Sequence, residues 1–245
     1  MTALAEEIQR TGKTVVCIAF SPRSGSTLLC NDLARAGLGR PTEIFQEPRY
    51  GEDSAAASQY ILDLIAETPG DTFSFKVSWS QAWELGRRLG ESEAEQRVLS
   101  LPEIFGKMSY IHLDREDKVA QAISWWRAAR TGQWHTLPGQ SVEDVSQEFD
   151  FDHARKILAQ LQVEEMLWRG RYKDWGVVPL NLEYDNFLNH RLDTVKAVCG
   201  YLGAEVPVNF EIDDNITKMA DEWSAKARLK LIELLETDRS LFANT

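Results

Sequence analysis

The sequence predicts an α/β fold with three layers, in which a central, mostly parallel sheet lies between helices. Three observations support this prediction. Short apolar runs that suit buried strands alternate with longer stretches of helical spacing. At the first strand-to-helix junction stands a segment with one glycine, an arginine and several hydroxyl groups, a combination that suits an anion-binding loop. The length of 245 residues suits a single domain, residues 1–245, with a sizeable core.

The first strand and the loop after it organise the chain. Residues 15–20 form a continuous apolar run, which favours a strand buried on both faces, and helical spacing begins a few residues later. Between them lies the segment SPRSGST, residues 21–27. Pro22 restricts one backbone angle and Gly25 allows a positive φ, so successive N–H groups can converge on an anion. We therefore expect a P-loop-like anion site at this junction.

The loop carries more chemistry than a helix cap needs. Capping requires one hydroxyl group, whereas this loop has Arg23 together with Ser24, Ser26 and Thr27. A guanidinium group and several hydroxyls suit a phosphate or a sulfate better than a carboxylate. The alternative is an ordinary capped turn. The loop also lacks the lysine of the GxxxxGK[ST] pattern, which disfavours a nucleoside triphosphate as its ligand.

Two further helix and strand pairs follow the loop. Residues 54–68 have the apolar spacing of a helix that ends at a Pro-Gly pair, and residues 72–79 have the composition of a second strand. Ser80 is expected to cap the next helix. A short helix is expected over residues 91–99, before the third strand at residues 108–113.

The remaining elements keep the alternation. Apolar spacing predicts a helix over residues 117–130 that ends before Gly132. A long amphipathic helix, a fourth strand, another helix and a helical tail then follow at residues 151–172, 177–183, 184–200 and 216–235. This order supports a parallel sheet whose ligands bind at the carboxyl ends of the strands.

Arg115 and Ser124 belong to the junction after the third strand. In a parallel sheet this junction can face the first loop, and both side chains can then contact one anionic ligand. On spacing alone, the alternative is a solvated arginine and a serine on the helix surface. The acids around Arg115 either complement the helix dipole or repel an incoming phosphate; they are Asp114, Glu116 and Asp117.

Composition limits the partners and the compartment. The formal net charge of −11 disfavours nucleic acid and anionic membranes as partners. The first residues are too polar for a secretory signal, and no segment approaches about 18 uninterrupted apolar residues, so stable membrane insertion is not expected. The three cysteines lie in apolar stretches without CxxC spacing, which indicates buried, reduced thiols. These features predict a cytoplasmic protein.

The two junctions resemble those of the sulfotransferase superfamily, most closely its bacterial trehalose 2-sulfotransferase branch. The segments that carry the resemblance are SPRSGSTLL, LDREDKVAQAISWWRAARTGQW, GRPTEIF, FKVSW and DEW. It implies an enzyme that moves a sulfuryl group from 3′-phosphoadenosine 5′-phosphosulfate (PAPS) to a hydroxyl of a carbohydrate or glycolipid, leaving adenosine 3′,5′-bisphosphate (PAP). No metal is expected, because the four histidines lack paired ligand spacing. Relatives form dimers, so a homodimer is also suggested.

The resemblance assigns roles to residues on the donor side. The 5′-phosphosulfate would be held by Arg23, Ser24, Gly25, Ser26 and Thr27, and the 3′-phosphate by Arg115 and Ser124. Lys218 and Trp223 would belong to a segment that closes over the donor. Glu43 is the expected general base, with Glu47 as its nearest competitor, because a carboxylate within hydrogen-bond reach can take the proton of a sugar hydroxyl. Arg23 would stabilise the charge that develops during transfer.

The acceptor side is predicted more loosely. Its expected residues are Phe45, Lys76, Trp79, Gln81 and Trp134. Lys76 either adds charge to the site or is a plain surface lysine, whereas Trp126 is expected in the core. Two other functions stay open: a P-loop phosphotransferase that uses a nucleoside triphosphate, and a nucleotide-binding module without turnover.

Overall fold

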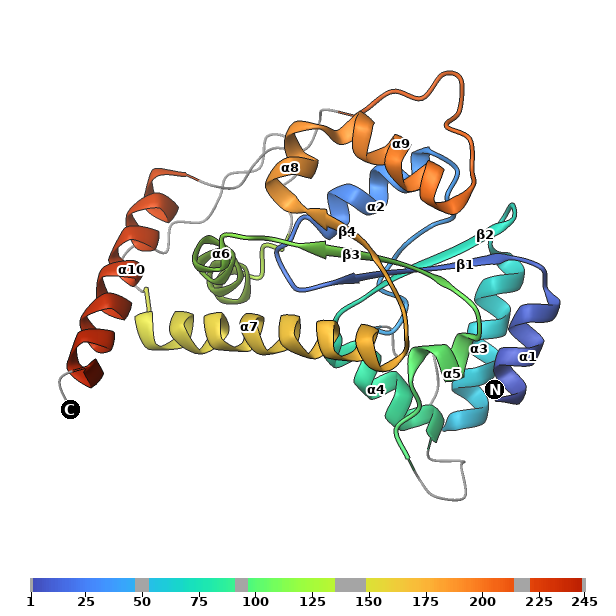
Figure 1. Ribbon diagram of the computed structural model, residues 1–245, viewed down its shortest axis with the longest axis horizontal. Helices are drawn as coiled ribbons and strands as arrows, with labels where there is room; N and C mark the ends of the chain where they lie inside the picture. The colour runs from blue at the N-terminus through green and yellow to red at the C-terminus, as the bar shows by residue number, and fades with distance from the viewer. Residues whose placement is uncertain (1, 47–52, 91–96, 135–148, 214–220, 244–245) are drawn as a thin grey trace.

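The computed structural model describes residues 2–46, 53–90, 97–134, 149–213 and 221–243 (Figure 1). Within these ranges, four parallel strands form one sheet in the order β2-β1-β3-β4. The strands are β1 (Thr14–Phe20), β2 (Thr72–Val77), β3 (Ser109–Asp114) and β4 (Leu180–Glu183). The predicted α/β fold with a central parallel sheet between helices is confirmed.

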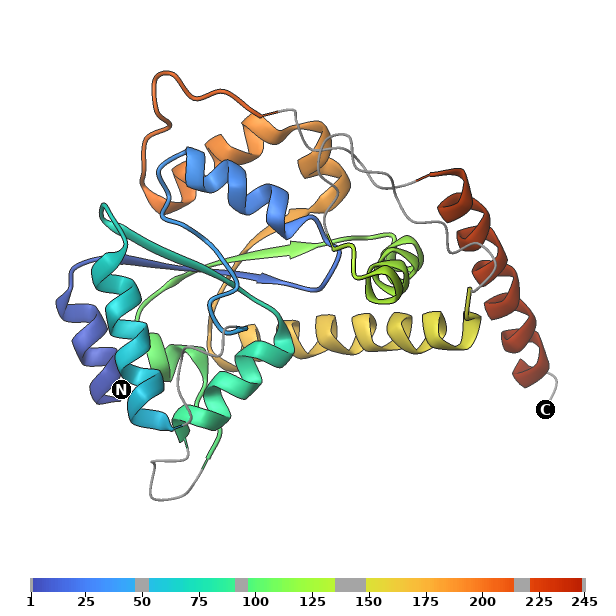
Figure 2. The same cartoon turned by 180° about the vertical axis from the view of Figure 1, so that it is seen from behind.

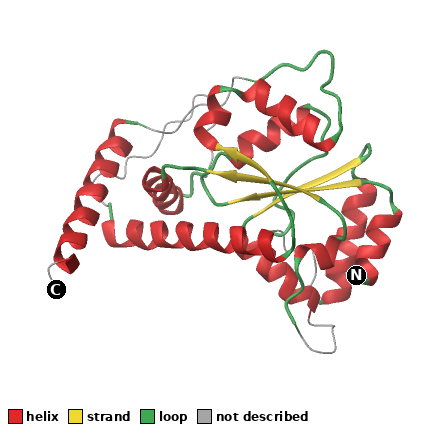
Figure 3. Cartoon of the chain, in the orientation of Figure 1, coloured by secondary structure: helices red, strands yellow, loops and turns green. Residues whose placement is uncertain are grey.

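Helices cover both faces of the sheet, so the strands lie between two helical layers (Figure 3). One face carries α2 (Ser26–Arg35), α8 (Tyr184–Asn189) and α9 (Arg191–Leu202). The other carries α1 (Ala3–Arg10), α3 (Ser54–Glu67), α4 (Trp79–Gly90), α5 (Leu101–Phe105) and α7 (Phe151–Asp174). In the described residues, no helix is both long enough and apolar enough to cross a membrane.

Two helices lie beyond the carboxyl ends of the strands. They are α6 (Lys118–Thr131) and α10 (Glu222–Ala243), which pack on each other at one end of the molecule (Figures 1 and 2). The arrowheads of β1 and β3 point toward α6 in Figure 1. The loops that leave these two strands therefore meet at the same edge of the sheet, close to the start of α6.

The two faces of β1 divide the core. Cys17 and its neighbours at alternate positions pack under α3, α4 and α7, whereas Val16 and Ile18 pack under α2 and α9. Every residue of β1 after Thr14 is buried, as expected for a strand covered on both faces. The buried free thiols predicted for the cysteines are confirmed, and burial raises the pKa of Cys30 to about 12.

Two local differences from the prediction arise at helix starts. The N-terminal helix α1 was not predicted, yet it places Ile8 in the core and is capped by Thr2. The expected cap at Ser80 is wrong. Helix α4 begins at Trp79, with Ser78 as its cap, because the Ser78 amide donates to Gln81 Oε1 at 2.9 Å and its hydroxyl accepts from the Gln81 amide at 3.4 Å.

Two other predicted helices have different bounds. The helix expected over residues 91–99 falls mostly outside the described residues, and residues 97–100 have no regular structure. A capping box of Ser100 and Glu103 starts α5 at Leu101 instead. The helix expected over residues 184–200 is divided at His190, whose φ of −136° is not helical.

A buried polar network joins β3 to α7 below the sheet. His112 Nδ1 lies 3.0 Å from the hydroxyl of Tyr172, and Nε2 lies 3.0 Å from Glu165 Oε2. Arg169 donates to Glu165 Oε1 at 2.7 Å. Burial alone would raise the pKa of Glu165, but the contacts with His112 and Arg169 outweigh it and hold that pKa well below its ordinary value. The network therefore stabilises the folded chain only while Glu165 is ionised.

We expect Glu165→Gln to weaken the acid dependence of stability. A carboxyl whose folded-state pKa is lowered stabilises above its unfolded value of about 4.3, and this stability is lost as the pH falls through the folded-state pKa. Urea unfolding from about pH 7 to pH 3 should show a smaller loss for this variant than for the natural chain. Glu164→Gln is the matched control. Burial raises the pKa of Glu164, so the effect of this carboxyl on the pH dependence of unfolding free energy has the opposite sign. Equal acid slopes in all three proteins would contradict the assignment.

Candidate active site

The loop between β1 and α2 has an unusual backbone. Arg23 has a φ of +68°, the one positive φ of a non-glycine residue in the described ranges, and Gly25 has a φ of +83°. Two left-handed residues separated by one position turn the chain sharply before α2 begins at Ser26. The sequence predicted this freedom for Gly25 but gave no signal for Arg23. Strained backbone of this kind is concentrated at binding and catalytic sites.

The two strand-to-helix junctions are in direct contact. Arg23 Nε donates to Ser124 Oγ at 3.0 Å, and Arg115 Nη1 donates to the carbonyl oxygen of Arg23 at 3.3 Å. This contact arises because β1 and β3 are neighbours and pair in parallel up to Phe20 and Leu113. The expected proximity of Arg115 and Ser124 to the first loop is therefore confirmed.

The electrostatics of this corner favour an anion. Burial lowers the pKa of Arg23, and the nearby charge of Arg115 lowers it further. Within the described residues, Ser24 Oγ and Arg115 Nε are buried without a hydrogen-bond partner. Buried donors are normally satisfied, so donors left over beside two guanidinium groups fit a ligand with several acceptor oxygens.

Lys76 completes the loop from the neighbouring strand. Its side chain is buried, and Nζ lies 2.8 Å from Glu43 Oε1 and 3.0 Å from Thr27 Oγ1. The interpretation of Lys76 as a plain surface lysine is wrong. The loop itself contains no lysine, but Lys76 on the neighbouring strand β2 contacts it at Thr27. Lys76 is thus a third cation near this loop and the start of α2.

Glu43 is held at both carboxylate oxygens. Oε1 is paired with Lys76, and Oε2 accepts from Gln81 Nε2 at 3.0 Å. The segment itself is fixed because the Lys76 amide donates to the carbonyl oxygen of Thr42 at 3.0 Å. The side chain of Glu43 remains 24% exposed, so a hydroxyl group can still reach it. Gln81 thus takes part in the cap of α4 and also donates a hydrogen bond to the Glu43 carboxylate.

The aromatic residues predicted for the acceptor side are in different environments. Trp79 is half-buried and lies edge-on to Trp168, with ring centroids 5.4 Å apart. Trp134 is 42% exposed, and its carbonyl oxygen accepts a hydrogen bond from Arg23. Phe45, also predicted for the acceptor side, has a ring that is 5% exposed and packs edge-on against Phe75 in the core. Its role in acceptor binding stays a prediction.

The C-terminal residues are only partly described. Trp223 stacks on Trp126 with ring centroids 6.1 Å apart, and Arg127 lies 5.0 Å from its ring centroid. Trp126 is in the core, as predicted. Lys218, assigned to the donor side, and Glu47, the competitor of Glu43, lie outside the described residues.

The acids around Arg115 are largely engaged with other groups. Asp114 accepts from Lys118 and, at 2.7 Å, from the Arg115 amide. Asp117 caps α6 through the Ala120 amide at 2.8 Å and pairs with Arg228 at 2.6 Å. Of the two roles predicted for these acids, the structure favours the structural one for Asp114 and Asp117.

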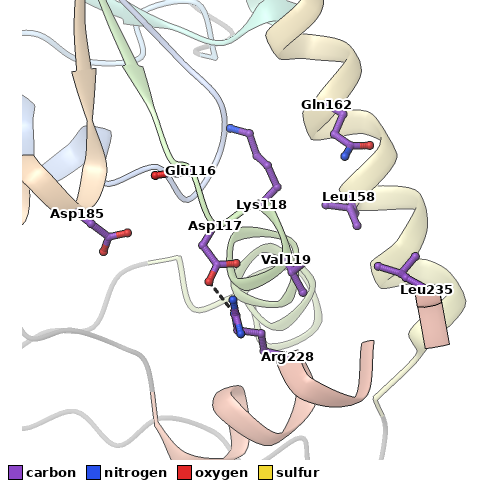
Figure 4. Close-up of a pocket in the computed structure, with 9 residues that line it drawn as sticks. All are labelled: Glu116, Asp117, Lys118, Val119, Leu158, Gln162, Asp185, Arg228 and Leu235. Carbon is purple, nitrogen blue, oxygen red and sulfur yellow. Dashed lines mark hydrogen bonds and ion pairs between the residues drawn. The ribbon is translucent and has the colours of Figure 1, made fainter. Parts of the chain in front are cut away.

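A pocket of about 610 Å³ lies at the start of α6 (Figure 4). Its lining includes the Asp117–Arg228 pair and the apolar side chains of Val119, Leu158 and Leu235. It shares no lining residue with the loop or with the Lys76–Glu43 pair. In the described residues, no group of three or more His, Cys, Asp or Glu side chains could hold a metal ion.

Comparison with known proteins places the chain among sulfotransferases. The model of the family described as Stf0 sulphotransferase matches residues 15–228, which include both junctions and Glu43. The trehalose 2-sulfotransferase of Mycolicibacterium smegmatis is 25% identical over 256 residues, covering 88% of this chain and 94% of the relative. That of Mycobacterium tuberculosis is 25% identical over 255 residues, covering 86% of this chain and 93% of the relative.

We expect Gly25→Ala to destabilise the loop more than a positive φ alone explains. A Cβ at Gly25 would lie 2.6 Å from two ring carbons of Tyr184, so either the ring or the loop has to move. Gly132→Ala is the matched control, because Gly132 has a similar φ of +71° and open space around its Cβ position. Each variant should lose about 1–2 kcal/mol of unfolding free energy through backbone strain, and Gly25→Ala should lose more. Equal losses in urea unfolding would show that the approach of Tyr184 is unimportant.

Proposed function

The chain belongs to the Stf0 sulphotransferase family, and we propose that it moves a sulfuryl group from PAPS to a hydroxyl of a carbohydrate or glycolipid. One observation carries the proposal. Arg23 joins the two junctions through Ser124 and Arg115, and the fixed Lys76–Glu43 pair contacts the same loop at Thr27. The proposed anion grip and the proposed carboxylate base therefore meet at one short loop.

The residues present fit a donor with two phosphate groups. The loop amides with Ser24, Ser26 and Thr27 would hold the 5′-phosphosulfate, and Arg115 with Ser124 would hold the 3′-phosphate. The buried, unpartnered Ser24 Oγ and Arg115 Nε support this fit. When bound, PAPS supplies an activated sulfuryl group and a phosphate leaving group. Trp223, and Lys218 in the segment before it, would complete the donor side.

Glu43 would act as the general base. Each carboxylate oxygen has two lone pairs, so contacts with Lys76 and Gln81 leave one on each oxygen for the acceptor hydroxyl. Because both oxygens are already fixed, no side-chain reorganisation is needed when the proton is taken. Lys76 connects Glu43 to the loop, because its ammonium group contacts both Glu43 and Thr27. The proposed base is therefore held at a fixed position relative to the proposed anion-binding loop.

Lys76 and Arg23 would stabilise the negative charge that develops during transfer. Fixed donors in a partly buried site contribute more than the same groups in water. Lys76 is held in place because its ammonium group is bonded to two side chains and lies 5.0 Å from the ring centroid of Phe20. We therefore propose that Lys76 acts at the reacting centre rather than in acceptor binding.

The acceptor would lie beside Glu43 and its partner Gln81, with Trp79 and Trp134 as further proposed contacts. Indole rings suit the apolar face of a sugar, and amide groups suit its hydroxyls. Both similar proteins are trehalose 2-sulfotransferases, so we propose a sugar acceptor, with a disaccharide as the first to test. Pocket shape rather than fold selects the individual sugar.

PAP should stabilise the protein more than ATP with magnesium or AMP does. PAP offers the 3′-phosphate that Arg115 and Ser124 would grip, which AMP lacks, and the loop has no dedicated triphosphate pattern. At about 100 times its dissociation constant a ligand adds roughly 2.7 kcal/mol to stability, which a thermal-shift assay detects. An equal or larger shift with ATP and magnesium would favour a phosphotransferase instead.

Glu43→Gln should abolish transfer while PAP binding stays intact. The amide keeps the shape of the side chain but cannot take a proton, and loss of a general base lowers kcat by about 10²- to 10⁴-fold. Sulfate transfer to trehalose or another disaccharide is measured together with the thermal shift given by PAP. Glu67→Gln, an exposed change at the end of α3, is the control. Full activity in Glu43→Gln would remove Glu43 from the mechanism.

A further inference from the structure

Gln121 on α6 is completely buried and reaches across to the first loop. Its Nε2 donates to Ser21 Oγ at 2.9 Å and to the carbonyl oxygen of Pro22 at 2.8 Å. Its Oε1 accepts from Lys118 Nζ at 3.4 Å, which fixes the orientation of the amide so that the donor side faces the loop. No motif in the sequence singled out this residue.

These contacts act on the strained residue of the loop. The Pro22–Arg23 peptide is trans, so its carbonyl and its N–H point in opposite directions. By holding the Pro22 carbonyl, Gln121 directs the Arg23 N–H to the opposite side. Arg115 holds the carbonyl of Arg23, and Ser124 accepts from its side chain. The left-handed Arg23 is thus held at the carbonyl of the preceding residue, at its own carbonyl and at its guanidinium group.

A left-handed conformation of a non-glycine residue persists only where its surroundings enforce it. Arg115 and Ser124, which contact Arg23, are proposed to bind the donor and would reorganise with it, whereas the Trp134 carbonyl accepts only from the end of the Arg23 guanidinium group. The side chain of Gln121 bonds to the loop and to Lys118, and it lies one helical turn before Ser124 on the same face of α6. Gln121 can therefore hold the loop backbone with and without a ligand.

We infer that Gln121 is a positioning residue that sets the loop backbone in its anion-binding conformation. The inference rests on the proposed function, since the ligand of the loop is taken to be the PAPS donor. Gln121 itself need not touch the donor. Its effect is transmitted through the Pro22 carbonyl and the φ of Arg23.

The test compares two glutamines that make the same kind of contact. Gln121→Met keeps the length of the side chain but removes both hydrogen bonds to the loop. Gln9→Met is the matched control, because Gln9 Nε2 donates to the carbonyl oxygens of Phe105 and Lys107 at 2.9 and 3.2 Å, between α1 and the end of α5. Calorimetry measures PAP affinity, and steady-state kinetics separate the KM of the donor from that of the acceptor.

We expect Gln121→Met to weaken PAP binding and raise the donor KM by about 10- to 100-fold, because a displaced binding group loses its geometry. The acceptor KM should be unchanged. Gln9→Met should keep both constants within about two-fold even where its unfolding free energy falls by a similar amount. This donor-specific effect is one that a purely structural role would not produce.

The outcomes separate this inference from the proposed function. If the natural chain does not bind PAP, the proposed function fails. If the natural chain binds PAP and Gln121→Met binds it equally well, or if both methionine variants lose affinity alike, the inference is overturned. Should Gln121→Met not fold, Gln121→Glu keeps the shape and the Lys118 contact but places an oxygen opposite the Pro22 carbonyl. Unchanged donor affinity in that variant also overturns the inference.

Discussion

The parallel pairing of β1 with β3 is the constraint on which the site depends. Neighbouring strands lie about 4.8 Å apart. The loops that follow two such strands at the same edge of the sheet therefore begin close enough for their side chains to touch. The pairing runs to Phe20 and Leu113, and the next residues are the first loop and the Arg115 junction. Strand β2 pairs with the other side of β1 and brings Lys76 to the same loop. Three segments that are far apart in sequence thus contribute cations to one edge.

The same arrangement stores unfavourable energy that a ligand can relieve. Arg23 and Arg115 repel each other at close range, and burial removes part of the water that would screen them. Arg23 also has a left-handed backbone, and Ser24 Oγ has no hydrogen-bond partner among the residues that the structure describes. Each feature lowers the stability of the folded chain, and each is relieved or used by an anion with several oxygens. The local rules of folding are broken where binding requires it and obeyed in the surrounding core.

The features that could be predicted from the sequence are those that a local residue pattern determines. Apolar runs located the strands, Gly25 marked the turn, and the spacing of Arg115 and Ser124 placed them at a junction. What it did not reveal depends on tertiary contacts between distant residues. Lys76 reaches Thr27 across 49 positions, and Gln121 reaches Ser21 across 100. The packing of Phe45 against Phe75 in the core likewise depends on residues far apart in the sequence. No local signal distinguishes such residues from ordinary surface or core residues.

The charge of the whole chain acts against an anionic donor, so the attraction has to be local. A net charge of −11 gives a field that repels phosphates, although physiological salt largely screens this repulsion beyond about 8 Å. Near the site, the acids next to Arg115 are neutralised by cations that belong to the scaffold, with Asp114 paired to Lys118 and Asp117 to Arg228. These pairs engage Asp114 and Asp117, whereas the carboxylate of Glu183 interacts with the charge of Arg115. Affinity for the proposed donor would therefore depend on the exact placement of a few groups in the loop, and a residue that only holds the loop would then matter as much as one that touches the ligand.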